Sequence, residues 1–62
     1  MRWYSVFEKA NGEDHCIFDN NCPSDKWAIE WAKNHFANCG NPLRVFRGKR
    51  IGRLIAEITQ MA

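Results

Sequence analysis

A chain of 62 residues with a formal net charge of +2 and an aromatic content of 13% predicts one small globular domain spanning residues 1–62. This composition excludes a disordered chain, and no apolar run is long enough to cross a bilayer. Three cysteines and first residues unlike a signal peptide favour a reducing, cytoplasmic setting over a disulfide framework.

Residues 2–9 and 14–19 predict a β-hairpin. Both segments are rich in aromatic and β-branched residues. They flank Asn11-Gly12, the dipeptide that best accepts the positive φ angles of a type I′ turn. We therefore expect two antiparallel strands joined by a two-residue turn.

The predicted turn also sets the pairing of the two strands. It would place Phe7 opposite Cys16 and Ser5 opposite Phe18, on one face together with Trp3. The other face would carry Tyr4, Val6 and Ile17, beside Glu8 and His15. Because both faces have apolar side chains, we expect one face to pack against a helix and the other to be exposed to solvent or to bind a partner.

The second element predicted is a helix from Asp25 to Asn38. Ser24 is suited to be its N-cap, Gly40 can take the left-handed conformation after its last turn, and Pro42 prevents continuation. Its apolar arc is wider than one-sided packing requires. The arc contains Trp27 and Trp31 on one flank, Ile29 and Phe36 on the other, and Ala28, Ala32, His35 and Cys39 between them. We expect one of the flanks to be only partly covered.

Residues 43–59 allow two interpretations. As strands, residues 43–47 and 51–58 form a second hairpin around 48–50, with Leu54, Ala56 and Ile58 on one face. As a helix, the C-terminal part fits the i, i+3, i+4, i+7 spacing with Ile51, Leu54, Ile55, Ile58 and Met61. Gly52 and the β-branched content favour strands. The predicted fold class is α+β, ββαββ, with a four-stranded antiparallel sheet packed by one helix; the alternative is ββαβα.

Four residues have nearly the spacing of metal ligands. Cys16, Cys22, His35 and Cys39 resemble the ligand set of a ββα zinc finger, whose cysteines usually lie two to four residues apart. The wider cysteine spacing and the position of the Asn-Gly turn depart from that pattern. We expect these thiols to act as small buried hydrophobic groups and expect no cofactor, with zinc as the alternative.

The sequence offers little for catalysis. His15 and Cys16 are neighbours in a predicted strand, so their side chains point to opposite faces and cannot form a nucleophile–base pair. Gly48-Lys49-Arg50 lacks the upstream glycine and following Ser or Thr of a phosphate-binding loop. Glu13 and Asp14 are expected to be solvated at a turn. We therefore expect a protein that is not an enzyme.

Charge is divided along the chain, since residues 1–31 hold six of the seven acids and residues 44–53 hold five of the nine bases. Such a basic block, with surplus aromatic residues, predicts binding to a protein with an acidic or mixed surface. The residues expected to bind the partner are Trp27, Trp31, Arg44, Arg47, Lys49, Arg50 and Arg53. An inhibitor or adaptor role fits, as in small accessory proteins of phages or mobile elements.

The same surfaces are also compatible with two other partners, nucleic acid and a second copy of the chain. Nucleic acid could lie along the basic residues 44–53, with an exposed Tyr4, Trp or Phe46 stacking on bases. An isoelectric point near 8.6 is below the range typical of dedicated nucleic-acid domains, which favours the protein partner. A homodimer would cover apolar groups on both sheet faces. No membrane partner is expected.

Overall fold

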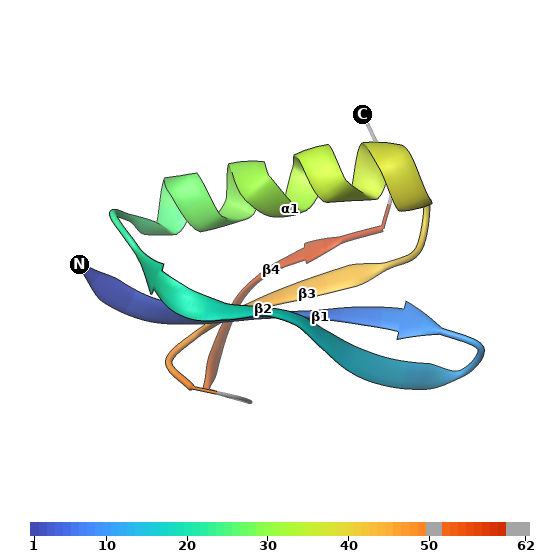
Figure 1. Cartoon of the computed structure of the whole chain (residues 1–62), viewed down its shortest axis with the longest axis horizontal. Helices are drawn as coiled ribbons and strands as arrows, with labels where there is room; N and C mark the ends of the chain where they lie inside the picture. The colour runs from blue at the N-terminus through green and yellow to red at the C-terminus, as the bar shows by residue number, and fades with distance from the viewer. Residues whose placement is uncertain (50–51, 60–62) are drawn as a thin grey trace.

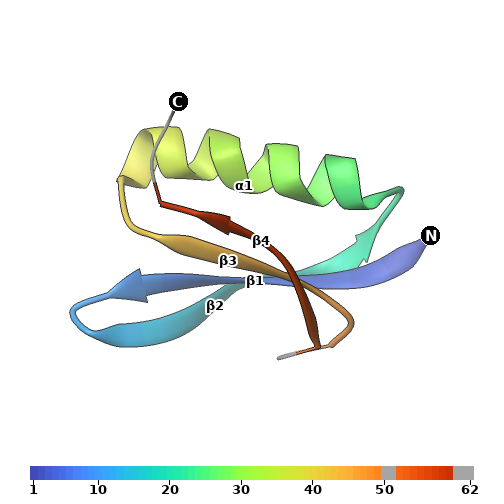
Figure 2. The same cartoon turned by 180° about the vertical axis from the view of Figure 1, so that it is seen from behind.

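The computed structural model describes residues 1–49 and 52–59 of the chain. Its elements in chain order are β1 (Arg2–Ala10), β2 (Glu13–Cys22), α1 (Asp25–Cys39), β3 (Leu43–Arg47) and β4 (Arg53–Ile58). The strands form one antiparallel sheet in the order β2-β1-β3-β4, and α1 lies across one of its faces (Figures 1 and 2). The predicted ββαββ arrangement is confirmed, and the helical alternative is wrong over β4. Ile51 and Met61, which that alternative used, lie outside the described residues.

The first hairpin has the predicted turn. Asn11 and Gly12 have φ angles of 54° and 80°, and Ala10 pairs with Glu13 across them. From this turn the register places Phe7 opposite Cys16, as expected from the sequence. The positive φ angles that Asn11 and Gly12 accept therefore determine both the turn and the adjoining pairs.

A β-bulge then shifts the register between Val6 and Phe7. Val6 pairs with Phe18 and Ser5 pairs with Asp19, so the predicted pairing of Ser5 with Phe18 is wrong. Ile17 is the extra residue of this bulge. Each residue after it in β2 therefore points to the face opposite to the one that continuous alternation predicts. Phe18 consequently lies on the helix side of the sheet, where its ring centroid is 4.8 Å from that of Trp31.

The helix α1 begins and ends as its sequence signals predict. The Ser24 hydroxyl accepts a hydrogen bond from the Trp27 amide at 3.2 Å, so Ser24 is the N-cap. Gly40 has φ 73° and donates its amide hydrogen to the Phe36 carbonyl at 2.8 Å. The helix extends one residue beyond the predicted end, to Cys39. Within the described residues, no helix is both long and apolar enough to pass through a membrane.

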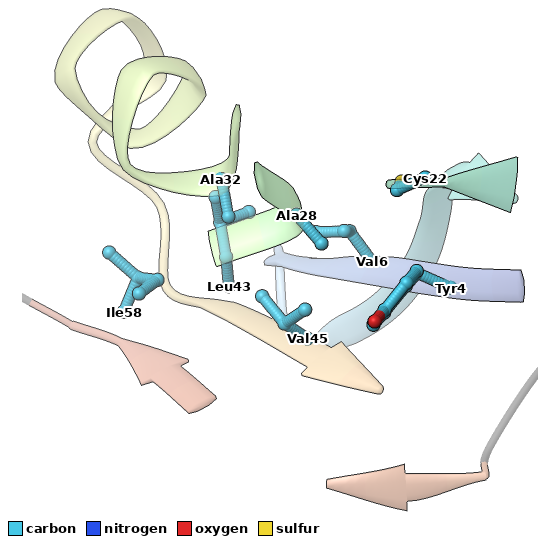
Figure 3. Packing of buried hydrophobic residues seen from close by; sticks show 8 residues of the cluster. All are labelled: Tyr4, Val6, Cys22, Ala28, Ala32, Leu43, Val45 and Ile58. Carbon is cyan, nitrogen blue, oxygen red and sulfur yellow. The ribbon is translucent and has the colours of Figure 1, made fainter. Parts of the chain in front are cut away.

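The core lies between α1 and the sheet. Figure 3 shows that side chains from all four strands and the helix meet there. These buried residues are Tyr4, Val6, Cys22, Ala28, Ala32, Leu43, Val45 and Ile58. Ala28 and Ala32 let the helix approach the sheet closely, while the larger residues on both flanks are only partly covered. Trp27, with 45% of its surface exposed, is the least covered of the four flank residues.

A second register shift lies in the β3–β4 hairpin. Val45 pairs with Ala56, but Phe46 pairs with Leu54, so Ile55 is the extra residue. Ala56 faces the helix side with Val45, whereas Leu54 faces the other side with Phe46. The prediction that Leu54 shares a face with Ala56 and Ile58 is therefore wrong.

Candidate functional site

The face of the sheet that points away from α1 combines aromatic and charged side chains. We call it the open face. Strand alternation and the two bulges place on it Trp3, Ser5, Phe7, Lys9, Asp14, Cys16, Asp19, Asn21, Arg44, Phe46, Leu54 and Glu57. These residues come from all four strands, so the surface exists only in the folded sheet.

A pocket of about 370 Å³ lies in the open face. Its lining consists of Phe7, Asp14, Arg44, Phe46 and Leu54. The Phe7 and Phe46 rings meet edge to face with their centroids 5.7 Å apart. Leu54 is 46% exposed, whereas Phe46 is only 8% exposed. The pocket thus has an aromatic floor, an accessible aliphatic wall and one charge of each sign.

The charges around this pocket are mixed. The Arg44 Nε atom lies 3.3 Å from a carboxylate oxygen of Glu57, and both side chains are about half exposed. The indole of Trp3 donates a hydrogen bond to Asp19, and the Lys49 ammonium lies 4.8 Å from the Trp3 ring centroid. Both cations and carboxylates therefore lie on the open face, and neither sign predominates.

Arg47 has a different setting from Arg44. On the helix side of the sheet, its guanidinium binds the carboxylate of Asp25, which also accepts a hydrogen bond from the buried Tyr4 hydroxyl. These bonds from Arg47 and Tyr4 hold the pKa of Asp25 below its ordinary value. The same carboxylate raises the pKa of Tyr4, chiefly through the hydrogen bond. Arg47 therefore joins β3 to the first turn of α1.

The remaining members of the expected binding set are dispersed. Arg53 is exposed and pairs with Arg47 across the β3–β4 ladder, while Lys49 lies over Trp3. Arg50 lies outside the described residues. Trp27 is exposed on α1, and Trp31 is half-buried beside Phe18. Among the described residues, the basic block does not form one surface, because strand alternation sends Arg44 and Arg47 to opposite faces.

The aromatic residues expected to stack on bases are less accessible than the sequence suggested. Tyr4 has none of its surface exposed, since it lies under α1 in the core, so its expected exposure is wrong. Phe46 lines the pocket on the open face, but only 8% of its surface is exposed. Trp3 also lies on that face, with the Lys49 ammonium 4.8 Å from its ring centroid.

The four residues that resemble a zinc-finger ligand set do not lie together in the structure. Cys16 is exposed and Cys22 is buried at the end of the same strand, so six residues of extended chain, roughly 20 Å, separate them. His35 and Cys39 lie one turn apart on α1 and meet Glu8 of β1. Burial raises the pKa of the Cys22 thiol, as expected for a small core residue.

Sequence reasoning missed most of the pocket. Phe7, Asp14 and Leu54 were absent from the expected binding residues, and Asp14 was expected to be a solvated turn residue. The Asn11-Gly12 turn and the pairing of Phe7 with Cys16 were signals that could have located Phe7 and Asp14 on one face. Leu54 depends on the β4 bulge, whose extra residue cannot be identified within the apolar run 54–56 from residue type alone.

Comparisons with known proteins add no functional information. No protein-family model matches the chain, and neither a curated protein nor a solved structure matches it significantly. The chemistry of the open face must therefore be interpreted from its own residues.

Proposed function

We propose that this chain is a non-enzymatic protein-binding domain, an inhibitor or adaptor, whose open face holds an apolar side chain of a partner protein. The observation that carries the proposal is the pocket formed by Phe7, Phe46 and Leu54 between the charges of Asp14 and Arg44. Protein interfaces commonly combine such an apolar centre with a polar rim. The three free thiols suit a cytoplasmic setting.

The charge pattern favours a protein partner over nucleic acid. Asp14, Asp19 and Glu57 share the open face with the aromatic residues. A phosphate backbone laid along this face would meet these carboxylates as well as Arg44 and Lys49. A protein segment with an apolar residue beside one acidic and one basic side chain would pair with both charges of the pocket.

Leu54 gives the sharpest test because it is half exposed and lies outside the main core. We expect Leu54→Glu to fold normally and to weaken partner binding by at least tenfold, since it places a charge in the apolar centre of the interface. Trp27→Ala is the matched control, because Trp27 is equally exposed but lies on the helix side.

The experiment is affinity capture from lysate with and without nuclease, followed by measurement of the dissociation constant for the purified partner. A stoichiometric protein that resists nuclease, binds Trp27→Ala and is lost by Leu54→Glu supports the proposal. If only Trp27→Ala abolishes partner binding, the interface lies on the helix side. Loss on nuclease treatment would favour nucleic acid, and concentration-dependent dimers of the isolated chain, disrupted by Leu54→Glu, would favour self-association.

A further inference from the structure

A second group of side chains with a chemical character of its own lies at the other side of the sheet. Glu8 comes from the end of β1, and His35 and Cys39 come from the last turns of α1. One ligand atom from each of them, an oxygen, a nitrogen and a sulfur, lies within 4.8 Å of both others. The fold thus brings together residues that are separated by 27 positions in the sequence.

These atoms are the donors that zinc prefers. Zinc binds thiolate at about 2.3 Å and imidazole or carboxylate at about 2.0–2.2 Å, in tetrahedral geometry. Ligand atoms in such a site lie roughly 3.3–3.8 Å from one another, as follows from those bond lengths. The three atoms here need to approach one another by about 1.5 Å at most, which side-chain rotation can supply.

The imidazole of His35 supplies an independent observation. Its Nε2 atom is buried and has no hydrogen-bond partner among the described residues. The nearest carboxylate oxygen, Oε1 of Glu8, is 3.8 Å away, which is too far for a hydrogen bond. The ring stacks on Trp31 with an interplanar angle of 8° and a centroid distance of 5.4 Å. A buried nitrogen held in place without a partner is suited to bind a metal ion.

Asn41 supports the other two ligands. Its side-chain amide donates a hydrogen bond to Oε2 of Glu8 at 2.8 Å, and its backbone amide donates to the sulfur of Cys39 at 3.5 Å. The Cys39 thiol in turn lies 4.0 Å from the Asn41 carbonyl oxygen, so Asn41 holds both side chains in place. Outer contacts of this kind orient ligands in known metal sites. The bond to Oε2 also leaves Oε1 of Glu8 on the side of His35.

We propose that Glu8, His35 and Cys39 form a zinc-binding site with three protein ligands and a fourth position for water or a ligand from another molecule. This site shares two residues with the set expected from the sequence and replaces Cys16 and Cys22 by Glu8. A zinc ion there connects the end of β1 to the last turns of α1. It is distinct from the open face, so neither proposal depends on the other.

The test uses Co²⁺ as a spectroscopic probe for zinc. We expect the purified chain to bind one equivalent with a thiolate-to-cobalt charge-transfer band and the visible bands of tetrahedral cobalt, and Zn²⁺ to displace it. Cys39→Ser should remove the charge-transfer band. Cys16→Ser, which changes an exposed thiol outside the site, should retain it. Zn²⁺ should also raise the Tm of the wild-type chain, because it binds the folded state.

Asn41→Ala tests the support of the site without removing a ligand. We expect Zn²⁺ affinity to fall by about 10–100-fold, the usual effect of losing an outer contact. Absence of a charge-transfer band in the wild-type chain would overturn the proposal, whatever the variants do. A band that survives in Cys39→Ser, with circular dichroism showing a folded chain, would also overturn it.

Discussion

Arg47 and Asp25, which lie 22 positions apart in the sequence, form a two-point contact between β3 and the N-terminus of α1. Both side chains are about one-third exposed, and the Tyr4 hydroxyl extends the contact into the core. The Asp25 carboxylate also lies in the first turn of the helix, where the helix dipole favours negative charge. One carboxylate thus links three of the five elements.

Asp25→Asn should lower the Tm at neutral pH, because the amide loses the charge-assisted bonds to Arg47. The folded-state pKa of Asp25 is below its unfolded value of about 3.9, so the stabilisation is present above that pH. It is lost as the pH falls through the folded-state pKa. Thermal melts at decreasing pH should therefore show the wild-type and variant curves converging in acid.

Glu30→Gln is the control for this prediction. Glu30 is an exposed helix carboxylate, 3.6 Å from Lys33, and surface pairs of this kind contribute little. We expect its Tm to follow the wild-type value at every pH. A difference between wild type and Asp25→Asn that stays constant into acid would show that the carboxylate charge is not the cause.

Local sequence signals predicted the parts of the fold that local chemistry controls. Asn11-Gly12 gave the first turn, and Ser24 and Gly40 gave the ends of the helix to within one residue. Each of these signals acts through its own backbone or a hydrogen bond within a few positions. The order of the elements follows from them, since turns and caps divide the chain.

The two bulges were not predicted because they change pairing without changing residue type. Each bulge lies in a run of three apolar residues, 16–18 and 54–56, and residue type alone does not show which member of the run is the extra one. The bulge in β4 also determines which of its residues lines the pocket of the candidate site. Only the shift at Ile55 places Leu54 opposite Phe46; if alternation continued, Ile55 would take that position instead.

Gly52→Ala should destabilise the β3–β4 hairpin. A Cβ atom at this position would lie 2.1 Å from the backbone carbonyl oxygen of Arg47, and the backbone would have to move. We expect a loss of roughly 1–3 kcal/mol in the free energy of unfolding, measured with urea. Gly40→Ala is a useful comparison, since its Cβ meets open space but its φ is 73°. It should cost about 1 kcal/mol from backbone strain alone. A Gly52→Ala variant that is as stable as the wild type would contradict the steric contact at Gly52.

Ala32→Leu should also destabilise the fold, because Ala32 is fully buried where α1 approaches the sheet. The added atoms would force the helix away from the sheet at a cost of about 1–3 kcal/mol. Ala37→Leu makes the same change on an exposed position of α1, where alanine and leucine have similar helix propensity. Urea unfolding should show a change within about 0.5 kcal/mol for this control. A stable Ala32→Leu variant would mean that the helix can shift without loss of packing.

Phe18→Ala tests the bulge in β2 directly. If Phe18 paired with Ser5, as continuous alternation predicts, its side chain would lie on the open face away from Trp31. In the bulged register it packs against Trp31 and Trp27, with centroid distances of 4.8 and 6.2 Å. We expect Phe18→Ala to cost about 1–3 kcal/mol, less than the roughly 3–5 kcal/mol of a fully buried phenylalanine. Its tryptophan fluorescence should also change in the folded state. Cys16→Ala, on the open face of the same strand, should leave both stability and fluorescence nearly unchanged, because Cys16 is exposed. A folded Phe18→Ala protein with wild-type fluorescence would place Phe18 on the open face and remove the bulge.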